Sequence, residues 1–186
     1  AEAFASLTIS NSTISGNTAS TGSGGAIHIA ASLDSLVVLN STIIDNSAGT
    51  SGASVFAGGA LAELQIGNSI LSSAATECSF LSAPTSTDFA NNWFDDVSCD
   101  GVASGLAPVA ALTQINARAY GHEPLNEALI AGGDPTICSA DPVSGVDQIN
   151  AARGTSQCSI GAIEIGNDSN FIIIKTKAGK VIVVPN

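Results

Sequence analysis

Large aromatic side chains and charged residues are both scarce in this chain of 186 residues. Aromatics make up 4% of it and charged residues 11%, whereas 45% is hydrophobic. Long amphipathic helices need many Glu, Lys and Arg residues on their solvent face, so this composition argues against a helical bundle. Ala, Val, Ile and Leu must fill the core, and the 19 glycines with many Ser, Thr and Asn residues are typical of short strands joined by tight turns.

Basic residues are the second scarcity. Five Lys and Arg residues stand against 16 Asp and Glu, which gives a formal net charge of −11, and residues 1–75 contain no Lys or Arg. This charge repels a phosphate backbone, so we expect no nucleic-acid partner. No run approaches the roughly 20 apolar residues that cross a bilayer, so we expect no membrane span.

The acidic balance favours calcium or cationic ligands, but it also keeps secreted proteins soluble, and no residue pattern supports a calcium site. We therefore predict no cofactor.

A repeat is the strongest positive signal. The segments 7–14, 36–43 and 64–71 share a Leu, a second apolar residue two or three positions later, and an Asn-Ser pair, and they start 29 and 28 residues apart. A fixed period of this length indicates a repeat architecture.

Apolar residues alternate within each unit. Leu7 and Ile9 point one way while Thr8 points the other, and Val37 and Gln65 take the place of Thr8 in the later units. Period two indicates strands, and each unit holds about three of them. The sequence therefore predicts a single-stranded parallel β-helix, with coils about 4.8 Å apart. A leucine-rich horseshoe is the runner-up, but its denser Leu pattern and helical segment are not found.

Asparagine recurs at the repeat period. Asn11, Asn40 and Asn68 follow the first strand of each unit, and Asn17 and Asn46 are again 29 residues apart. We predict that these amides stack at coil corners as ladders, which satisfy backbone groups in the turns. Asn11-Ser-Thr and Asn40-Ser-Thr are also glycosylation sequons, which is the alternative explanation of the motif.

The repeat is not detectable after residue 75. We predict that residues 1–75 form about three coils, continuing upstream in a longer parent, and that residues 76–186 form an irregular C-terminal cap. Natural solenoids cover their open strand edges and core in this way. Two apolar runs around Ala178-Gly179 predict a final β-hairpin, with a secretion or sorting tag as the alternative.

All four cysteines lie in the second half of the chain: Cys78, Cys99, Cys138 and Cys158. An even count in a loop-rich, acidic segment indicates disulfides and an oxidising compartment, so we expect an extracellular location. Three pairings are open, and we favour the two local ones, Cys78 with Cys99 and Cys138 with Cys158. Zinc is the weaker alternative, because no Cys-x-x-Cys occurs. Arg153 is expected to form an ion pair with Asp147 or Glu164 that holds the cap together.

Two stretches carry a family resemblance. Residues 7–19, followed by Gly24-Gly-Ala-Ile27, resemble the right-handed β-helix repeats of bacterial surface proteins related to polymorphic outer-membrane proteins, which implies a right-handed solenoid. Residues 128–164, with Asp147-Gln148, Arg153 and Cys158-Ser-Ile-Gly-Ala-Ile-Glu164, resemble the choice-of-anchor C-terminal region of such proteins. The tail departs from that pattern at Ile149-Asn150, Gly154 and Ser159. The resemblance implies export and display at a bacterial surface.

No catalytic residues are predicted. Glycosidases need two carboxylates facing a groove, and the sequence shows no such pair within the regular repeats. Lyases need a base such as Lys or Arg, and residues 1–75 contain neither. We therefore expect a non-enzymatic surface module for display or adhesion, with polysaccharides or cell-surface glycans as its partners. The alternative is the C-terminal part of a polysaccharide lyase or glycoside hydrolase whose catalytic coils lie upstream. Nothing in the sequence indicates an oligomeric state.

Overall fold

The computed structural model describes residues 5–73, 75–99, 113–115, 122–124, 132–164, 171–175 and 181–185. The protein is all-β, with parallel sheets and two disulfides. Within the described residues the only α-helix is the five-residue α2 (Pro135–Ser139). The composition therefore gives the coarse fold class correctly.

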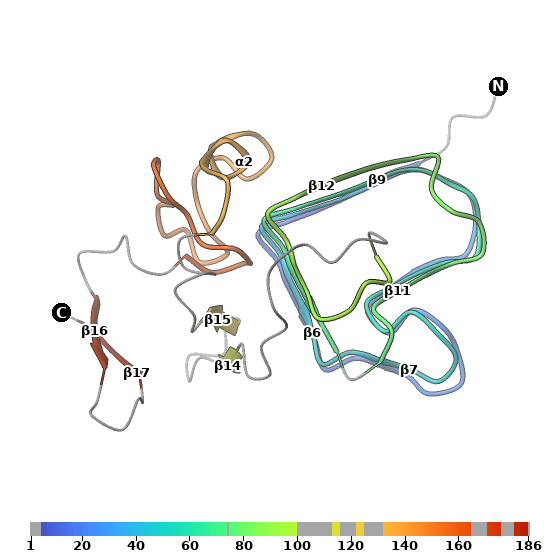
Figure 1. The fold of residues 1–186 in the computed structure, drawn as a ribbon, viewed down its shortest axis with the longest axis horizontal. Helices are drawn as coiled ribbons and strands as arrows, with labels where there is room; N and C mark the ends of the chain where they lie inside the picture. Colours follow the sequence, from blue (N-terminus) through green and yellow to red (C-terminus); the bar gives the residue numbers. More distant parts are fainter. Residues whose placement is uncertain are drawn as a thin grey trace.

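Three parallel sheets share one core; we call each passage of the chain through the three sheets a coil, and the sheets together the stack. The first consists of β1 (Ser6–Ser10), β5 (Leu33–Leu39), β9 (Leu61–Gly67) and β12 (Ser86–Ala90). The second consists of β2 (Thr13–Ser15), β6 (Thr42–Ile44), β10 (Ile70–Ser72) and β13 (Trp93–Phe94), and the third of β4 (Ile27–Ile29), β8 (Val55–Ala57) and β11 (Cys78–Phe80). A short pair, β3 (Thr18–Ala19) with β7 (Ser47–Ala48), joins them. Figure 1 looks along this stack, so the successive coils lie over one another.

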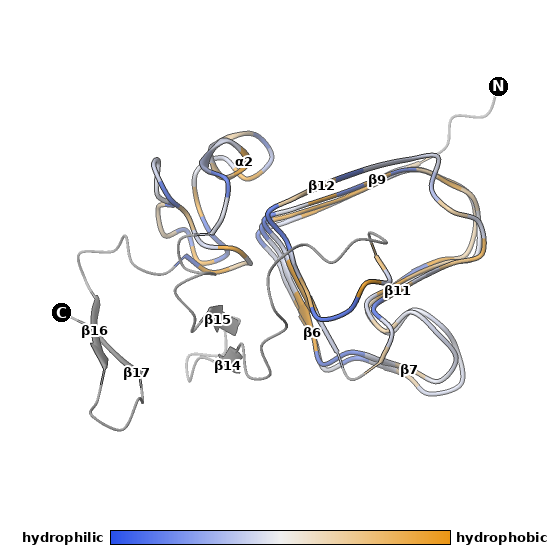
Figure 2. Ribbon diagram, in the orientation of Figure 1, coloured by the Kyte–Doolittle hydropathy of each residue, from blue (hydrophilic) through white to orange (hydrophobic). Residues whose placement is uncertain are grey.

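The register follows the repeat. Leu7 lies opposite Leu36, and Leu36 lies opposite Leu64, as their equivalent sequence positions predict. The inward side chains Leu36, Val38 and Leu64 have no exposed surface, and they pack in one core with Ile43, Val55, Ile66 and Leu71. Figure 2 shows these hydrophobic stretches along the stacked strands. Layers of aliphatic side chains therefore fill the interior, as the scarcity of aromatics requires.

The stacking continues past residue 75, where the sequence showed no further repeat. Cys78, Thr87 and Phe94 lie opposite Val55, Leu64 and Leu71, so β11, β12 and β13 add a further layer to each sheet. This coil is shorter: Asn92 follows its partner Ser69 by 23 residues, where Ser69 follows Ser41 by 28. A search at a fixed period misses a shortened coil. The division of the chain at residue 75 into two domains remains a prediction.

The disulfide-bearing region 132–164 lies beside the stack. Figure 1 shows it, with α2, next to the corner between the first and second sheets, and not over an end of the stack. It contacts three successive coils through Asn11, Asn40 and Asn68. These contacts lie on the flank of the stack, and we call residues 132–164 the side segment.

Two antiparallel pairs complete the described structure: β14 (Thr113–Ile115) with β15 (His122–Pro124), and β16 (Phe171–Lys175) with β17 (Val181–Pro185). The second pair is the hairpin that the C-terminal apolar runs predict. Its turn, Ala178-Gly179, lies outside the described residues.

Candidate functional site

Three asparagines form the corner that the side segment contacts. Asn11, Asn40 and Asn68 have φ angles of 47°, 45° and 48°, in the left-handed region that Asn adopts more easily than most residues. Their backbone N–H groups donate to the next coil, at the carbonyls of Leu39, Gly67 and Ala90. Figure 2 shows the polar character of this corner. The recurring Asn residues therefore allow the chain to turn at the same place in each coil.

The side chains of this column turn outward to the side segment. One bond of the predicted ladder is present, from Asn68 Nδ2 to Asn40 Oδ1 at 3.5 Å. Asn68 also donates to the Asp134 carbonyl at 2.9 Å and accepts from the Asp134 N–H at 2.7 Å. Asn11 donates to the Val143 carbonyl at 3.1 Å, and Asn40 donates to Cys138 Sγ at 3.2 Å. The column mainly anchors the side segment, a role that the sequence did not suggest.

Clearer ladders lie elsewhere. Asn17 Nδ2 donates to Asn46 Oδ1 at 3.0 Å, as expected for the second column. A further ladder uses hydroxyls: the backbone N–H of Ser12 donates to Ser41 Oγ, and that of Ser41 to Ser69 Oγ. These ladders satisfy backbone groups that the turns leave open.

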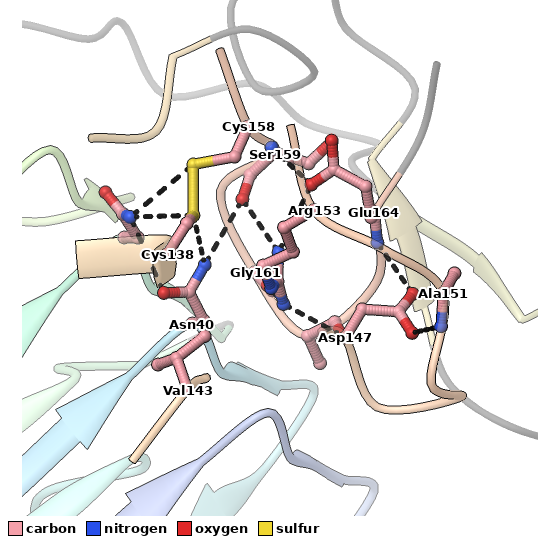
Figure 3. A network of polar contacts seen from close by, with 12 residues as sticks. Asn40, Cys138, Val143, Asp147, Ala151, Arg153, Cys158, Ser159, Gly161 and Glu164 are labelled. Atoms are coloured by element: carbon pink, nitrogen blue, oxygen red, sulfur yellow. Dashed lines mark hydrogen bonds and ion pairs between the residues drawn. A yellow bond between two sulfur atoms is a disulfide. The ribbon is translucent and has the colours of Figure 1, made fainter. Parts of the chain in front are cut away.

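Arg153 is the centre of the side segment (Figure 3). It forms an ion pair with Glu164 at 3.4 Å, and both side chains are almost fully buried. The guanidinium also donates to Asn11 Oδ1 at 3.0 Å, which links it to the first coil. Burial lowers the pKa of Arg153, and the negative charges of Glu164 and Asp147 oppose this shift. Its remaining bonds go to the carbonyls of Val146, Ser159, Gly161 and Ala162.

Asp147, which the sequence suggested as an ion-pair partner of Arg153, acts mainly through hydrogen bonds from backbone N–H groups. Its carboxylate accepts backbone N–H bonds from Ile149, Ala151 and Glu164, at 2.8, 2.8 and 2.9 Å. The next residue, Gln148, accepts a 2.6 Å bond from the hydroxyl of Thr13 in the first coil. Asp147 therefore shapes the turn that presents Gln148 to the stack.

Both local disulfides are formed. Cys78 pairs with Cys99, and Cys138 pairs with Cys158, which are the two pairings that the sequence favours. The first closes the shortened coil. The second ties α2 to Cys158, which forms an isolated β-bridge with Gly133, and it lies beside Asn40 and Asn68.

A groove lies between the first sheet and α2. Its cavity volume is about 720 Å³. One wall is the outward row of the sheet, and the other is α2 with the residues that follow it; the lining residues are Thr8, Val37, Leu39, Gln65, Thr136, Ile137, Ala140, Asp141 and Pro142. Sequence alternation identified Thr8, Val37 and Gln65 as outward residues. The opposite wall could not be anticipated, because no pattern places α2 beside them.

No family model, curated protein or solved structure matches the chain. The site must therefore be interpreted from its own chemistry. Among the described residues, no group of three or more His, Cys, Asp or Glu side chains is arranged to hold a metal ion. In the same part of the chain, no helix is long and apolar enough to cross a membrane.

A pair of carboxyl groups lies inside the last coil. Glu77 is fully buried and accepts a bond from the Ser54 hydroxyl, while Asp95 accepts bonds from the Ser72 hydroxyl and the Ser73 N–H. Glu77 Oε1 and Asp95 Oδ1 have no donor among the described groups. Burial raises the pKa of Glu77 to about 8, the Ser54 bond opposes this, and the neighbouring Asp95 raises it further. A protonated Glu77 that donates to Asp95 satisfies both oxygens.

The buried carboxyl pair and the groove differ in the chemistry that they can support. The Glu77 carboxyl has no exposed surface, so a polymer substrate cannot reach it. The groove is accessible but contains one carboxylate, Asp141, where glycoside hydrolysis needs two. The groove is suited to binding, and the carboxyl pair to a structural role.

Proposed function

We propose that this chain is a non-enzymatic, exported β-helix module of a bacterial surface protein, which binds glycans in the groove between its first sheet and α2. In this proposal the stack is a right-handed, single-stranded parallel β-helix. The support is the parallel pairing of equivalent strands from successive repeats, together with the strong general preference for right-handed crossovers between parallel strands.

Export is supported by the two disulfides, because oxidised cysteine pairs persist mainly outside the reducing cytosol. The resemblance to bacterial surface repeats and to the choice-of-anchor region points the same way. Of the residues of that resemblance, Gln148 and Arg153 bond to Thr13 and Asn11 of the first coil. Asp147 and Glu164 bond within the side segment and hold its shape.

The groove is the observation on which glycan binding rests. Ligand sites are concave, mostly apolar and equipped with a few polar groups that fix orientation. Val37, Ile137 and Pro142 supply the apolar surface here, and Thr8 and Gln65 supply a hydroxyl and an amide. A linear chain of sugars offers both surfaces, with C–H groups on its ring faces and hydroxyls at its edges.

A glycan array with the labelled protein tests binding, and release of reducing ends or unsaturated uronates from plant and algal polysaccharides tests turnover. We expect binding without turnover. Thr8→Trp should fill the groove and abolish binding. Thr18→Trp is the matched control, because Thr18 is an exposed strand threonine outside the groove.

Two results would contradict the proposal. Turnover of any polysaccharide would show that the module is catalytic. Absence of binding to every glycan class, by a protein that is folded, would remove the groove as a glycan site.

A further inference from the structure

The outward row of the first sheet forms a regular, one-dimensional surface. Thr8, Val37, Gln65 and Asp88 are in register across β1, β5, β9 and β12. Neighbouring strands are about 4.8 Å apart, so these side chains recur at that interval along the stack. Such a row matches a ligand that is itself a linear repeat, laid along the stack.

The facing wall is held in place independently of any ligand. Asp134, which precedes α2 and caps it, bonds to Asn68 in both directions, and the Cys138–Cys158 disulfide closes the other side. Ile137 packs close to the sheet at Gly67, where a Cβ atom would lie 3.0 Å from its Cδ1 atom. The groove is therefore formed before binding, which lowers the entropic cost of association.

Negative charge gathers around this groove. Asp141 lines it, Asp88 accepts a 3.1 Å bond from the groove residue Gln65, and Glu63 lies on the same face two residues before Gln65. Residues 1–117 contain no Lys or Arg. Arg153, the only basic residue of the side segment, is buried and paired with Glu164. No cation within the described stack or side segment balances these carboxylates at the surface.

We propose that the groove selects glycans that carry free amino groups, such as oligomers of glucosamine. This inference rests on the proposed function and names the ligand class of the same site. The apolar wall contacts the C–H faces of the sugar rings, Thr8 and Gln65 bind hydroxyls, and the ammonium groups lie near Asp141, Asp88 and Glu63. Uronate and sulfated chains are repelled by the same carboxylates.

Calorimetric titration with glucosamine oligomers, N-acetylglucosamine oligomers of the same length and galacturonate oligomers tests this selection. The buffer is slightly acidic and low in salt, so that amines and carboxylates are both charged and weakly screened. We expect the glucosamine oligomer to bind at least about tenfold more tightly than its acetylated counterpart, since several exposed ion pairs contribute together. The galacturonate oligomer should not bind.

Variants locate the effect. Asp141→Asn should weaken glucosamine binding by roughly two- to fivefold, the range of one exposed ion pair, and leave binding of the acetylated oligomer unchanged. Asp45→Asn is the matched control: Asp45 is exposed, lies outside the groove and has a φ angle of 53° that Asn accepts, so it should change nothing. When the titrations are repeated at high salt, the preference for the glucosamine oligomer over the acetylated oligomer should disappear.

The outcomes separate this inference from the proposed function. Equal binding of the amine and acetylated oligomers would overturn the charge selection and leave glycan binding intact. Binding of oligolysine as tightly as of glucosamine oligomers would show that charge alone is recognised, which also overturns it. Failure of every oligosaccharide class would overturn the proposed function itself.

Discussion

Replacing Glu77 by Gln tests the buried carboxyl pair directly. Gln has nearly the shape of protonated Glu, and its amide can donate to Asp95 Oδ1 while its carbonyl accepts from the Ser54 hydroxyl. The variant therefore keeps the hydrogen bonds of the protonated pair but cannot ionise. In the wild type, the pKa of Glu77 is raised from 4.5 to about 8, mainly by burial.

The raised pKa makes stability depend on pH. The folded protein holds the Glu77 proton more tightly than the unfolded chain, so this contribution is complete below about pH 4.5 and is lost as the pH rises to about 8. One pKa unit corresponds to about 1.4 kcal/mol, so the loss is on the order of 3 kcal/mol by pH 7 and about 5 kcal/mol by pH 8. We expect Glu77→Gln to be more stable than the wild type by amounts of this order, with the difference growing from pH 4.5 to 8.

Urea unfolding followed by circular dichroism at several pH values between 4 and 9 measures this difference. Glu63→Gln is the matched control: Glu63 is exposed on β9, so its removal should leave the pH dependence unchanged. The reasoning would be refuted by parallel stability curves for wild type and Glu77→Gln, or by a variant that is less stable at pH 8.

Two further substitutions test how the side segment is held. Arg153→Lys keeps a positive charge near Glu164 but loses the guanidinium group that also donates to Asn11. We expect the free energy of unfolding, measured in urea, to fall by about 2–4 kcal/mol. An unchanged unfolding midpoint would contradict the anchoring role of Arg153. Gly161→Ala places a Cβ atom 2.7 Å from Thr42 Oγ1 at a φ angle of 97°, so we expect a loss of about 2 kcal/mol or more. In this variant, amide hydrogens of residues 132–164 should exchange faster than in the wild type. Exchange at the wild-type rate would argue that Gly161 is not needed to pack the side segment against the stack.

The stack could be predicted because its physics is local and periodic. In a parallel stack, equivalent residues lie directly above one another, so the recurrence of Leu7, Leu36 and Leu64 fixes both the strand type and the register. Two-residue alternation within each strand then separates Leu36, which is buried, from Val37, which lines the groove. These features need no information beyond the sequence of one coil and its neighbours.

The remaining features depend on contacts between distant parts of the chain. Arg153 meets Asn11 across 142 residues, and Asn68 meets Asp134 across 66, neither of which leaves a periodic signal. Glu164 was correctly considered as a partner of Arg153, because it lies in the same segment. The last coil was missed because its shortening removes the only regularity by which a coil is recognised.

The anchoring of the Asn column has a consequence for how the protein can be produced. Asn40 is fully buried, and the Asn11 amide is committed to Val143, yet both head Asn-Ser-Thr sequons. An oligosaccharide attached to either nitrogen would remove its donor and occupy the space of residues 132–164. In a eukaryotic secretory pathway, oligosaccharide transfer would compete with folding at both positions. In molecules modified there, residues 132–164 could not pack against the stack. A host without this transferase avoids the competition, so the periplasm of a bacterium suits both the disulfides and the asparagines.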